Sequence, residues 1–103
     1  MPQKIDAEQS ILGSMFLSDK ALQRIIETIN KDMFYLDSHK KIFEVIKNLS
    51  DNKSPIDITT VTAELERKKL LNQVGGVEYL TQIINSVPTA ANADEYVYWR
   101  NIR

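Results

Sequence analysis

The stretch Val74–Asn92, VGGVEYLTQIINSVPTAAN, decides how the chain is interpreted. It holds two of the three glycines in 103 residues, placed directly before a helical pattern. Paired glycines at such a place either cradle a phosphate or let one helix stop and the next begin. A P-loop needs a preceding strand and a Gly-x-x-x-x-Gly-Lys-Ser/Thr pattern, and this stretch has neither. We therefore expect Gly75 to be a left-handed helix stop and Gly76 to be a flexible entry to the next helix.

The segment after the glycines is predicted to be a helix that ends near Ser86, before Pro88. One face of it carries Val77, Leu80, Ile83, Ile84 and Val87. Tyr79 lies off this stripe, about 100° around the helix from Leu80. Tyrosine buries a large area yet keeps a polar tip, which is favoured at interfaces. We nominate Tyr79 as a contact with a primase or a neighbouring subunit; the alternative is a half-buried tyrosine on the flank of the stripe.

The same helical period runs through the chain before the glycines. The first helix is expected from about Ala7 to Leu17, with Asp6 as its N-cap and Gln9 completing a capping-box-like pair. Ser18-Asp19 caps a second helix, for which Asn30 is the expected left-handed stop. The two apolar stripes are Ile11, Leu12, Met15 and Phe16, and then Leu22, Ile25, Ile26 and Ile29.

A short turn of helix is expected in the connector 31–36, whose apolar cluster is Met33, Phe34, Tyr35 and Leu36. Asp37 or Ser38 caps a third helix with the stripe Ile42, Phe43, Ile46 and Leu49. A polar loop, SDNKSP (50–55), follows, and Asp57 opens a fourth helix that carries Ile58, Val61 and Leu65. The β-branched run 56–62 also suits a strand. We prefer a helix because a lone strand has no partner here and residues 63–69 are strongly helix-forming.

A sixth helix is expected from near Thr89 to the end of the sequence, with apolar residues most of the way round. That distribution implies burial on more than one side. We expect this helix to be the truncated start of a helical hairpin, and we nominate Tyr96, Tyr98 and Trp99 for hairpin packing and assembly; contact with the domain's own core is the alternative. The sequence thus predicts an all-α fold, a single domain over residues 1–103 built as a compact bundle of five to six short helices.

Composition excludes several classes of site. The chain has no cysteine, which removes disulfides, thiolate zinc sites and cysteine nucleophiles. The 13 Lys and Arg residues against 14 Asp and Glu residues give no basic surplus of the kind that drives nucleic-acid binding. No apolar run approaches the ~18–20 residues needed to span a bilayer, and the first residues lack the apolar core of a signal peptide. We expect a cytoplasmic domain that binds neither membrane nor nucleic acid directly.

No residue pattern indicates a catalytic, metal or cofactor site. His39 is the only histidine, and near a helix start it is expected to be a capping or packing residue. The carboxylates are scattered over expected solvent faces and caps, so no acid–base pair is assigned. Arg67–Lys69 is interpreted as a solvated helix end, since cations favour a helix C-terminus. A small enzyme is the remote alternative, and it would require Asp57, His39 and another carboxylate to converge in a pocket.

Five stretches, in the right order, together resemble one family, the bacterial replicative DNA helicases of the DnaB type. IDAEQSILGSMFL (5–17) resembles the opening helix of their N-terminal domain, which reads Glu-Ala-Glu-Gln-x-x-Leu-Gly. DMFY followed by HKKIFEVI (32–46) is similar to the family's Asp-Phe-Tyr and His-x-x-Ile-Phe segment. SPIDITTVTAELERKKLL (54–71), VGGVEYL (74–80) and SVPTAANADEYV (86–97) complete the set.

The resemblance implies a function that the residues alone do not supply. Full-length members are ring-shaped hexamers that unwind DNA with ATP and Mg²⁺ bound in a motor domain, which is missing here. Their N-terminal domains form a collar, pair through helical hairpins, recruit primase and, in some members, engage a helicase loader. The chain is thus expected to bind proteins and to need no cofactor of its own. Two positions depart from the motifs: Asp6 stands where Glu is usual, and Met33 interrupts the connector.

A small DNA-binding regulator is the alternative function, with the third and fourth helices as a helix-turn-helix pair. Such a protein would lose DNA affinity steeply with salt. The loop SDNKSPID (50–57) is long for the usual 3–4-residue turn of that motif, which argues against this alternative.

Overall fold

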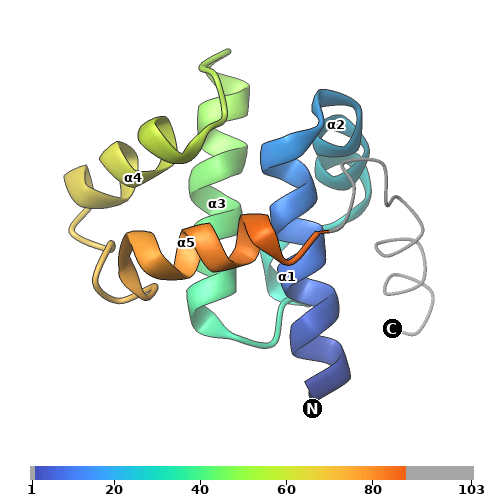
Figure 1. The fold of residues 1–103 in the computed structure, drawn as a ribbon. Coiled ribbons are helices and arrows are strands. Elements are labelled where there is room, and N and C mark those ends of the chain that lie inside the picture. Colours follow the sequence, from blue (N-terminus) through green and yellow to red (C-terminus); the bar gives the residue numbers. More distant parts are fainter. Residues whose placement is uncertain (1, 88–103) are drawn as a thin grey trace.

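Helices form the framework of residues 2–87, the part of the chain that the computed structural model describes (Figure 1). They are α1 (Pro2–Leu17), α2 (Asp19–Thr28), the 3-10 turn η1 (Lys31–Met33), α3 (Asp37–Asp51), α4 (Ile58–Arg67) and α5 (Gly76–Asn85). No strand occurs within these residues, so the all-α prediction is confirmed and the β-branched run is helical from Ile58 onward. The predicted sixth helix lies outside the described residues.

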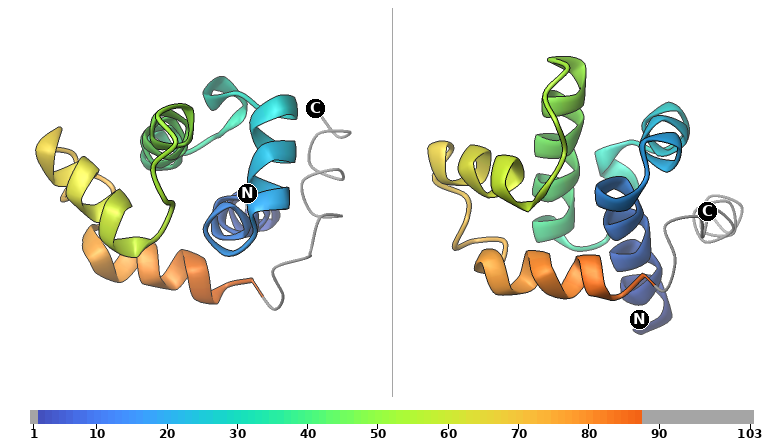
Figure 2. Two further views of the ribbon diagram at one scale, coloured as in Figure 1. Left: turned by 90° about the horizontal axis from the view of Figure 1, so that it is seen from above. Right: turned by 45° about the horizontal axis from the view of Figure 1, so that its top comes forward.

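The helices α1 and α3 lie side by side and run in the same direction (Figures 1 and 2). α2 packs against α1 and returns the chain, and η1 then leads it to the start of α3. α4 packs against α3, while α5 packs across α1 and against α4. The beginnings of α1 and α3 therefore lie at the same end of the bundle, which decides where their first buried side chains meet.

Side-chain caps fix the starts of α2 and α4, as the sequence predicted. The Ser18 hydroxyl accepts a hydrogen bond from the Ala21 N–H at 3.1 Å. The Asp57 carboxylate accepts the Thr60 N–H at 2.8 Å, and the Thr60 hydroxyl accepts the Asp57 N–H at 3.1 Å, which completes a capping box. These bonds satisfy amide groups that the first turn of a helix leaves unpaired.

The predicted start of α1 is wrong. The helix begins at Pro2, five residues before Ala7, because proline suits the first helical position, where its missing N–H is not needed. Asp6 consequently lies inside the helix on the solvent side and caps nothing. Gln9, expected in the same capping box, is also in the helix interior and makes its side-chain hydrogen bond to another helix.

Two further boundary predictions are wrong around the η1 connector, although the short turn itself is confirmed. α3 begins at Asp37, and its N-cap is Leu36, which makes no side-chain cap. Asn30 is extended, with φ −121°, and therefore does not end α2 in the left-handed conformation. Its side chain instead accepts the Asp32 N–H at 2.9 Å and so starts η1.

The stops after α3 and α4 and the turn before α5 each have a left-handed residue, and only one of these three residues is a glycine. Gly75, with φ 108°, is the stop that the sequence predicted, whereas Lys53 and Lys69 each have φ 61°. At each stop the next residue donates to a carbonyl five positions back: Ser54 N to Leu49 O at 2.9 Å, Leu70 N to Leu65 O at 2.8 Å and Gly76 N to Leu71 O at 2.9 Å. This shared geometry satisfies carbonyls at the end of the segment.

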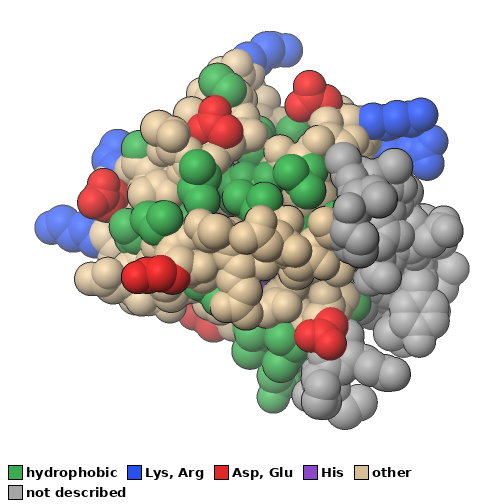
Figure 3. Space-filling model, viewed as in Figure 1, with side chains coloured by type: hydrophobic (Ala, Val, Ile, Leu, Met, Phe, Trp, Pro, Cys, Tyr) green, Lys and Arg blue, Asp and Glu red, His purple; other side chains and the backbone are tan. Residues whose placement is uncertain are grey.

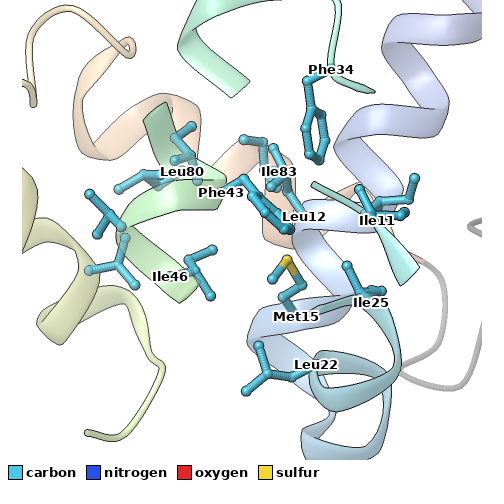
Figure 4. Close-up of a cluster of buried hydrophobic side chains, with 14 of the residues drawn as sticks. Ile11, Leu12, Met15, Leu22, Ile25, Phe34, Phe43, Ile46, Leu80 and Ile83 are labelled. Carbon is cyan, nitrogen blue, oxygen red and sulfur yellow. The ribbon is translucent and has the colours of Figure 1, made fainter. Parts of the chain in front are cut away.

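The core is built from the predicted apolar stripes (Figure 4). Apolar side chains with at most 1% exposure come from all five α-helices: Ile11, Leu12 and Met15; Ile25; Ile42, Phe43 and Ile46; Val61 and Leu65; Leu80 and Ile83. Phe34 from the connector joins them, with its ring centroid 5.2 Å from that of Phe43. Two predicted members are wrong, since Val77 is 43% exposed and Tyr35 is 65% exposed; the backbone of each is held, but its side chain points to solvent.

Candidate functional site

A chain of hydrogen bonds crosses the core at the end where α1 and α3 begin. The Glu8 carboxylate lies 2.7 Å from Nδ1 of His39, and both side chains are fully buried. The second oxygen of Glu8 accepts the backbone N–H of Tyr35 at 2.5 Å. A carboxylate removed from water needs such partners, because an unpaired buried charge is strongly destabilising. Glu8 therefore ties both α3 and the connector before it to α1.

The chain of hydrogen bonds continues from His39 towards the surface through α5. Nε2 of His39 lies 2.6 Å from the Tyr79 hydroxyl, and the two rings are nearly parallel, with 10° between their planes. The side-chain amide of Gln9 donates to the same hydroxyl at 3.1 Å. Gln9 and Tyr79 are half-buried, so they are the members that reach solvent. We refer to Glu8, Gln9, His39 and Tyr79 as the polar network.

Helix register explains why these polar side chains lie in the core. Glu8 and His39 each occupy the first position of an apolar stripe and are followed by apolar residues 3, 4 and 7 positions later. In α1 the stripe reads Glu8, Ile11, Leu12, Met15, and in α3 it reads His39, Ile42, Phe43, Ile46. Because the two helices start at the same end of the bundle, the two first positions face each other. This repeated pattern is the signal that could have located the pair from sequence.

The order carboxylate, imidazole, hydroxyl is also the order of groups in a nucleophilic triad, where the acid orients the imidazole. Here the imidazole is fully buried and the hydroxyl is held from two sides, by His39 and by Gln9. The arrangement thus orients a surface tyrosine. Among the described residues, no three His, Cys, Asp or Glu side chains come together in a way that could hold a metal ion.

The side chains with shifted pKa values lie on the surface, away from the polar network. A hydrogen bond from Lys41, reinforced by its charge, lowers the pKa of Asp37. Hydrogen bonds from Arg67, at 2.6 and 3.0 Å, lower the pKa of Glu64, and the same bonds raise the pKa of the Arg67 guanidinium. These are exposed pairs three or four residues apart on one helix, an arrangement of small energetic consequence.

The structure places the nominated residues as follows. Tyr79 is half-buried on the flank of its stripe, and its hydroxyl belongs to the polar network; its contact with a partner stays a prediction. Tyr96, Tyr98 and Trp99 lie outside the described residues.

His39 is a packing residue, as predicted, but its carboxylate partner, Glu8, was not identified from the sequence. The cluster that the enzyme alternative required does not form, since Asp57 caps α4 while His39 bonds to Glu8. Arg67–Lys69 is exposed, which confirms the solvated helix end. The α3–α4 connection, residues 52–57, remains longer than a helix-turn-helix turn.

A groove separate from the polar network lies between α2 and the end of α3. It encloses about 670 Å³. Leu22 and Ile26 contribute apolar surface from α2, Ile56 contributes from the loop before α4, and Asp19 and Asp51 add carboxylates. The groove shares no residue with the polar network, so substitutions can test the two features independently.

Comparison with known proteins decides the family. The sequence pattern of the DnaB-like helicase N terminal domain matches residues 1–99. The chain belongs to this family. It is 50% identical over 95 residues to the replicative DNA helicase DnaC of Bacillus subtilis and 43% identical over 95 residues to the replicative DNA helicase DnaB of Geobacillus stearothermophilus. Each alignment covers 92% of this chain but only 21% of the relative, so the chain spans about a fifth of the length of these helicases.

A solved structure shares the fold of this DnaB-like domain. The crystal structure of the N-terminal domain of DnaB helicase from Mycobacterium tuberculosis has a TM-score of 0.86 and 41% sequence identity, and the match covers 95% of this chain and 66% of that one. The stretches that resembled the family meet in the polar network: Glu8 and Gln9 come from the first, His39 from the second and Tyr79 from VGGVEYL. No helix among the described residues is long and apolar enough to cross a membrane.

Proposed function

We propose that this chain is the protein-interaction domain of a replicative DNA helicase, which assembles the collar of a hexamer and recruits primase and, where one is used, the helicase loader. The ATP-dependent unwinding, with its ATP and Mg²⁺, belongs to a motor domain of the longer protein. The protein acts in the cytoplasm, and this domain contacts polypeptides without binding DNA directly. Family membership over residues 1–99 and the names of the relatives support the proposal.

The observation that carries the proposal is the way Tyr79 is held at the surface. Its hydroxyl is fixed by His39 at 2.6 Å and Gln9 at 3.1 Å, and His39 is fixed in turn by the buried Glu8. A side chain held in one orientation loses little conformational entropy on binding, and rigid tyrosines are common interface anchors. A half-buried tyrosine oriented from within the core suits a docking contact.

The surrounding surface is also suited to a protein partner. Figure 3 shows hydrophobic side chains gathered above α5, between α4 and α1, with charged side chains spread around the margin of the same face. An apolar centre with a polar rim is the usual anatomy of a protein interface. The exposed Val77 adds further apolar surface on α5.

Isothermal titration calorimetry of this chain with the primase of the same organism tests recruitment. Tyr79→Ala is expected to weaken binding by roughly tenfold or more, the effect of losing an interface anchor. Tyr35→Ala, which removes an equally large aromatic group outside the polar network, controls for general loss of aromatic surface, and circular dichroism verifies that each variant is folded. Absence of primase binding by the unaltered chain would refute recruitment, and an unchanged affinity of Tyr79→Ala would remove that residue.

Collar assembly is tested on the full-length helicase. Multi-angle light scattering is expected to show a hexamer, and Trp99→Ala together with Tyr96→Ala and Tyr98→Ala is expected to shift the population to smaller species. The same preparation should hydrolyse ATP, whereas the 103-residue chain should not. A hexamer that is insensitive to these three substitutions would remove the assembly role of the aromatic residues.

A further inference from the structure

We propose that the polar network sets the hydrogen-bonding polarity of Tyr79: with His39 neutral, Tyr79 offers a partner only an acceptor, and proton uptake by His39 turns it into a donor. The partner group that docks on Tyr79 is therefore a donor, such as a lysine ammonium, an arginine guanidinium or an amide N–H. This inference takes only the identity of the partner, primase, from the proposed function. The polarity itself is a property of this chain.

The inner end of the network fixes where the imidazole proton lies. An ionised carboxylate only accepts hydrogen bonds. One oxygen of Glu8 receives the Tyr35 N–H, and the other lies 2.7 Å from Nδ1 of His39. A contact of that length between two buried atoms requires a proton between them, and Nδ1 is the atom that can supply it. In the neutral imidazole Nε2 is then left as an acceptor.

The outer end follows from the inner one. With Nε2 as an acceptor, the 2.6 Å contact with Tyr79 must be a hydrogen bond that the phenol donates inward. The amide NH₂ of Gln9 can only donate, so it donates to the phenol oxygen. The single phenol proton is thereby used within the core. Any remaining capacity of Tyr79 towards a partner is that of an acceptor.

Protonation of His39 inverts this arrangement. Both ring nitrogens then donate, Nδ1 to Glu8 and Nε2 to the Tyr79 oxygen. With the NH₂ of Gln9 still donating to that oxygen, the phenol proton turns outward. The titratable groups that the structure places against His39 are Glu8 from α1 and Tyr79 from α5, while the connector contributes the edge of the Phe34 ring at 6.3 Å. A partner's carboxylate or carbonyl would be favoured only in this state.

Nuclear magnetic resonance of the isolated chain tests the polarity without any partner. His39 is the only histidine. In a ¹⁵N-histidine sample without an affinity tag, both ring ¹⁵N signals therefore belong to His39, and only Nδ1 and Nε2 need to be distinguished. We expect a protonated Nδ1 and an unprotonated Nε2 in the neutral form. Glu8→Gln is expected to weaken this preference, because an amide can meet Nδ1 with either an acceptor or a donor, whereas Tyr35→Phe should leave it unchanged. A neutral form with the proton on Nε2 would overturn the inference.

The binding consequence is tested with primase as the probe. We expect the affinity to fall between a pH at which the ring ¹⁵N signals report a neutral His39 and a lower pH at which they report a protonated one. Tyr79→Phe should weaken binding roughly fivefold at the higher pH, the effect of one hydrogen bond, and should remove the pH dependence, while Tyr35→Phe should keep it. Tighter binding at low pH, or an unaltered pH dependence in Tyr79→Phe, would overturn the inference. A complete lack of primase binding would refute the proposed function instead, and the tautomer measurement would still decide the polarity.

Discussion

The two ends of the face that α1 buries are stabilised in different ways. At the start of the helix, Glu8 meets His39 through a directed hydrogen bond of 2.7 Å between groups with no exposure to solvent. One and two turns later, Leu12 and Met15 belong to the apolar cluster that also includes Leu22 and Ile25, with no polar partner required (Figure 4). The helical spacing is the same along the whole stripe. At the polar end the hydrogen bond fixes how the two side chains are oriented, whereas at the apolar end the side chains need mainly to fill the available volume.

The difference teaches which end tolerates change. Apolar contacts are undirected, so a replacement of similar volume repacks at small cost. A buried ion-pairing group has no such substitute, because removal of one member leaves the other unpaired in a medium that solvates it poorly. The stability that the polar end contributes should therefore require both Glu8 and His39. At the apolar end, each residue should contribute to stability separately.

The largest expected effect comes from removing one member of the buried pair. His39→Leu keeps an approximately equal volume but leaves Glu8 without its partner, and we expect a loss of about 3–5 kcal/mol in the free energy of unfolding. Urea denaturation at neutral pH, followed by circular dichroism, measures this loss. A loss below about 1 kcal/mol would mean that Glu8 does not depend on His39.

A matched double variant separates pairing from packing. Glu8→Leu combined with His39→Leu removes both polar side chains, and it is expected to be more stable than His39→Leu alone because no carboxylate is left buried. The double variant should still be less stable than the unaltered chain. The Tyr35 N–H loses its acceptor on Glu8, and the Tyr79 hydroxyl loses its acceptor on His39. If the two single losses simply add, the pair is not coupled and the contrast between the two ends fails.

A cavity at Leu12 should destabilise the apolar end of the α1 face. Leu12 has no solvent exposure, and Leu12→Ala is expected to cost about 2–5 kcal/mol, centred near 3, from lost burial and the space left behind. Leu12→Met, which nearly conserves volume, should cost less than about 1.5 kcal/mol. The same urea experiment applies to both variants. Equal losses in the two would show that this end is as specific in shape as the polar end.

Sequence reasoning succeeded where spacing alone carries the information. The stripes of α1, α2 and α3, the Asp57 cap and the Gly75 stop each depend on residues close to one another in the chain. The left-handed Lys53 and Lys69 were not predictable in this way, because lysine has no preference for that conformation.

The polar network was missed for a different reason. Each of its hydrogen bonds joins residues between 27 and 70 positions apart, so no local pattern contains the pair. From the sequence, His39 was placed at a helix start and Glu8 was given no role. Their equivalent positions in two apolar stripes would have indicated burial, and a buried carboxylate would have demanded a hydrogen-bond partner. The start of α1 was misjudged for a local reason, since Pro2 was not recognised as a helix start.

A smaller effect is expected at Gly13, where α1 packs against the end of α5. A Cβ atom on Gly13 would lie 2.5 Å from Cγ2 of Val87 and 2.6 Å from the Ile83 carbonyl oxygen. Gly13→Ala should therefore cost about 1–2 kcal/mol by overpacking, although alanine is the better helix former by about 1 kcal/mol. Adding Val87→Ala should relieve only the side-chain half of the clash, because the carbonyl remains. A Gly13→Ala variant that is more stable than the parent in urea would show that the crossing is loose.

The smallest expected effect is a gain in stability. It concerns two helix ends that lie outside the buried face of α1. Lys53 and Lys69 hold φ 61° with a Cβ atom that disfavours it, so Lys53→Gly and Lys69→Gly should each stabilise the fold. We expect about 0.5 kcal/mol, because relief of the left-handed strain is partly offset by the greater chain entropy of glycine in the unfolded state. Gly75→Ala is the matched opposite, since its Cβ would sit 2.7 Å from Cβ of Tyr79 at φ 108° and should destabilise both the stop and the surface end of the polar network. Thermal unfolding of the three variants side by side measures the effects, and a lower midpoint for both lysine variants would show that their side chains contribute contacts worth more than the backbone strain.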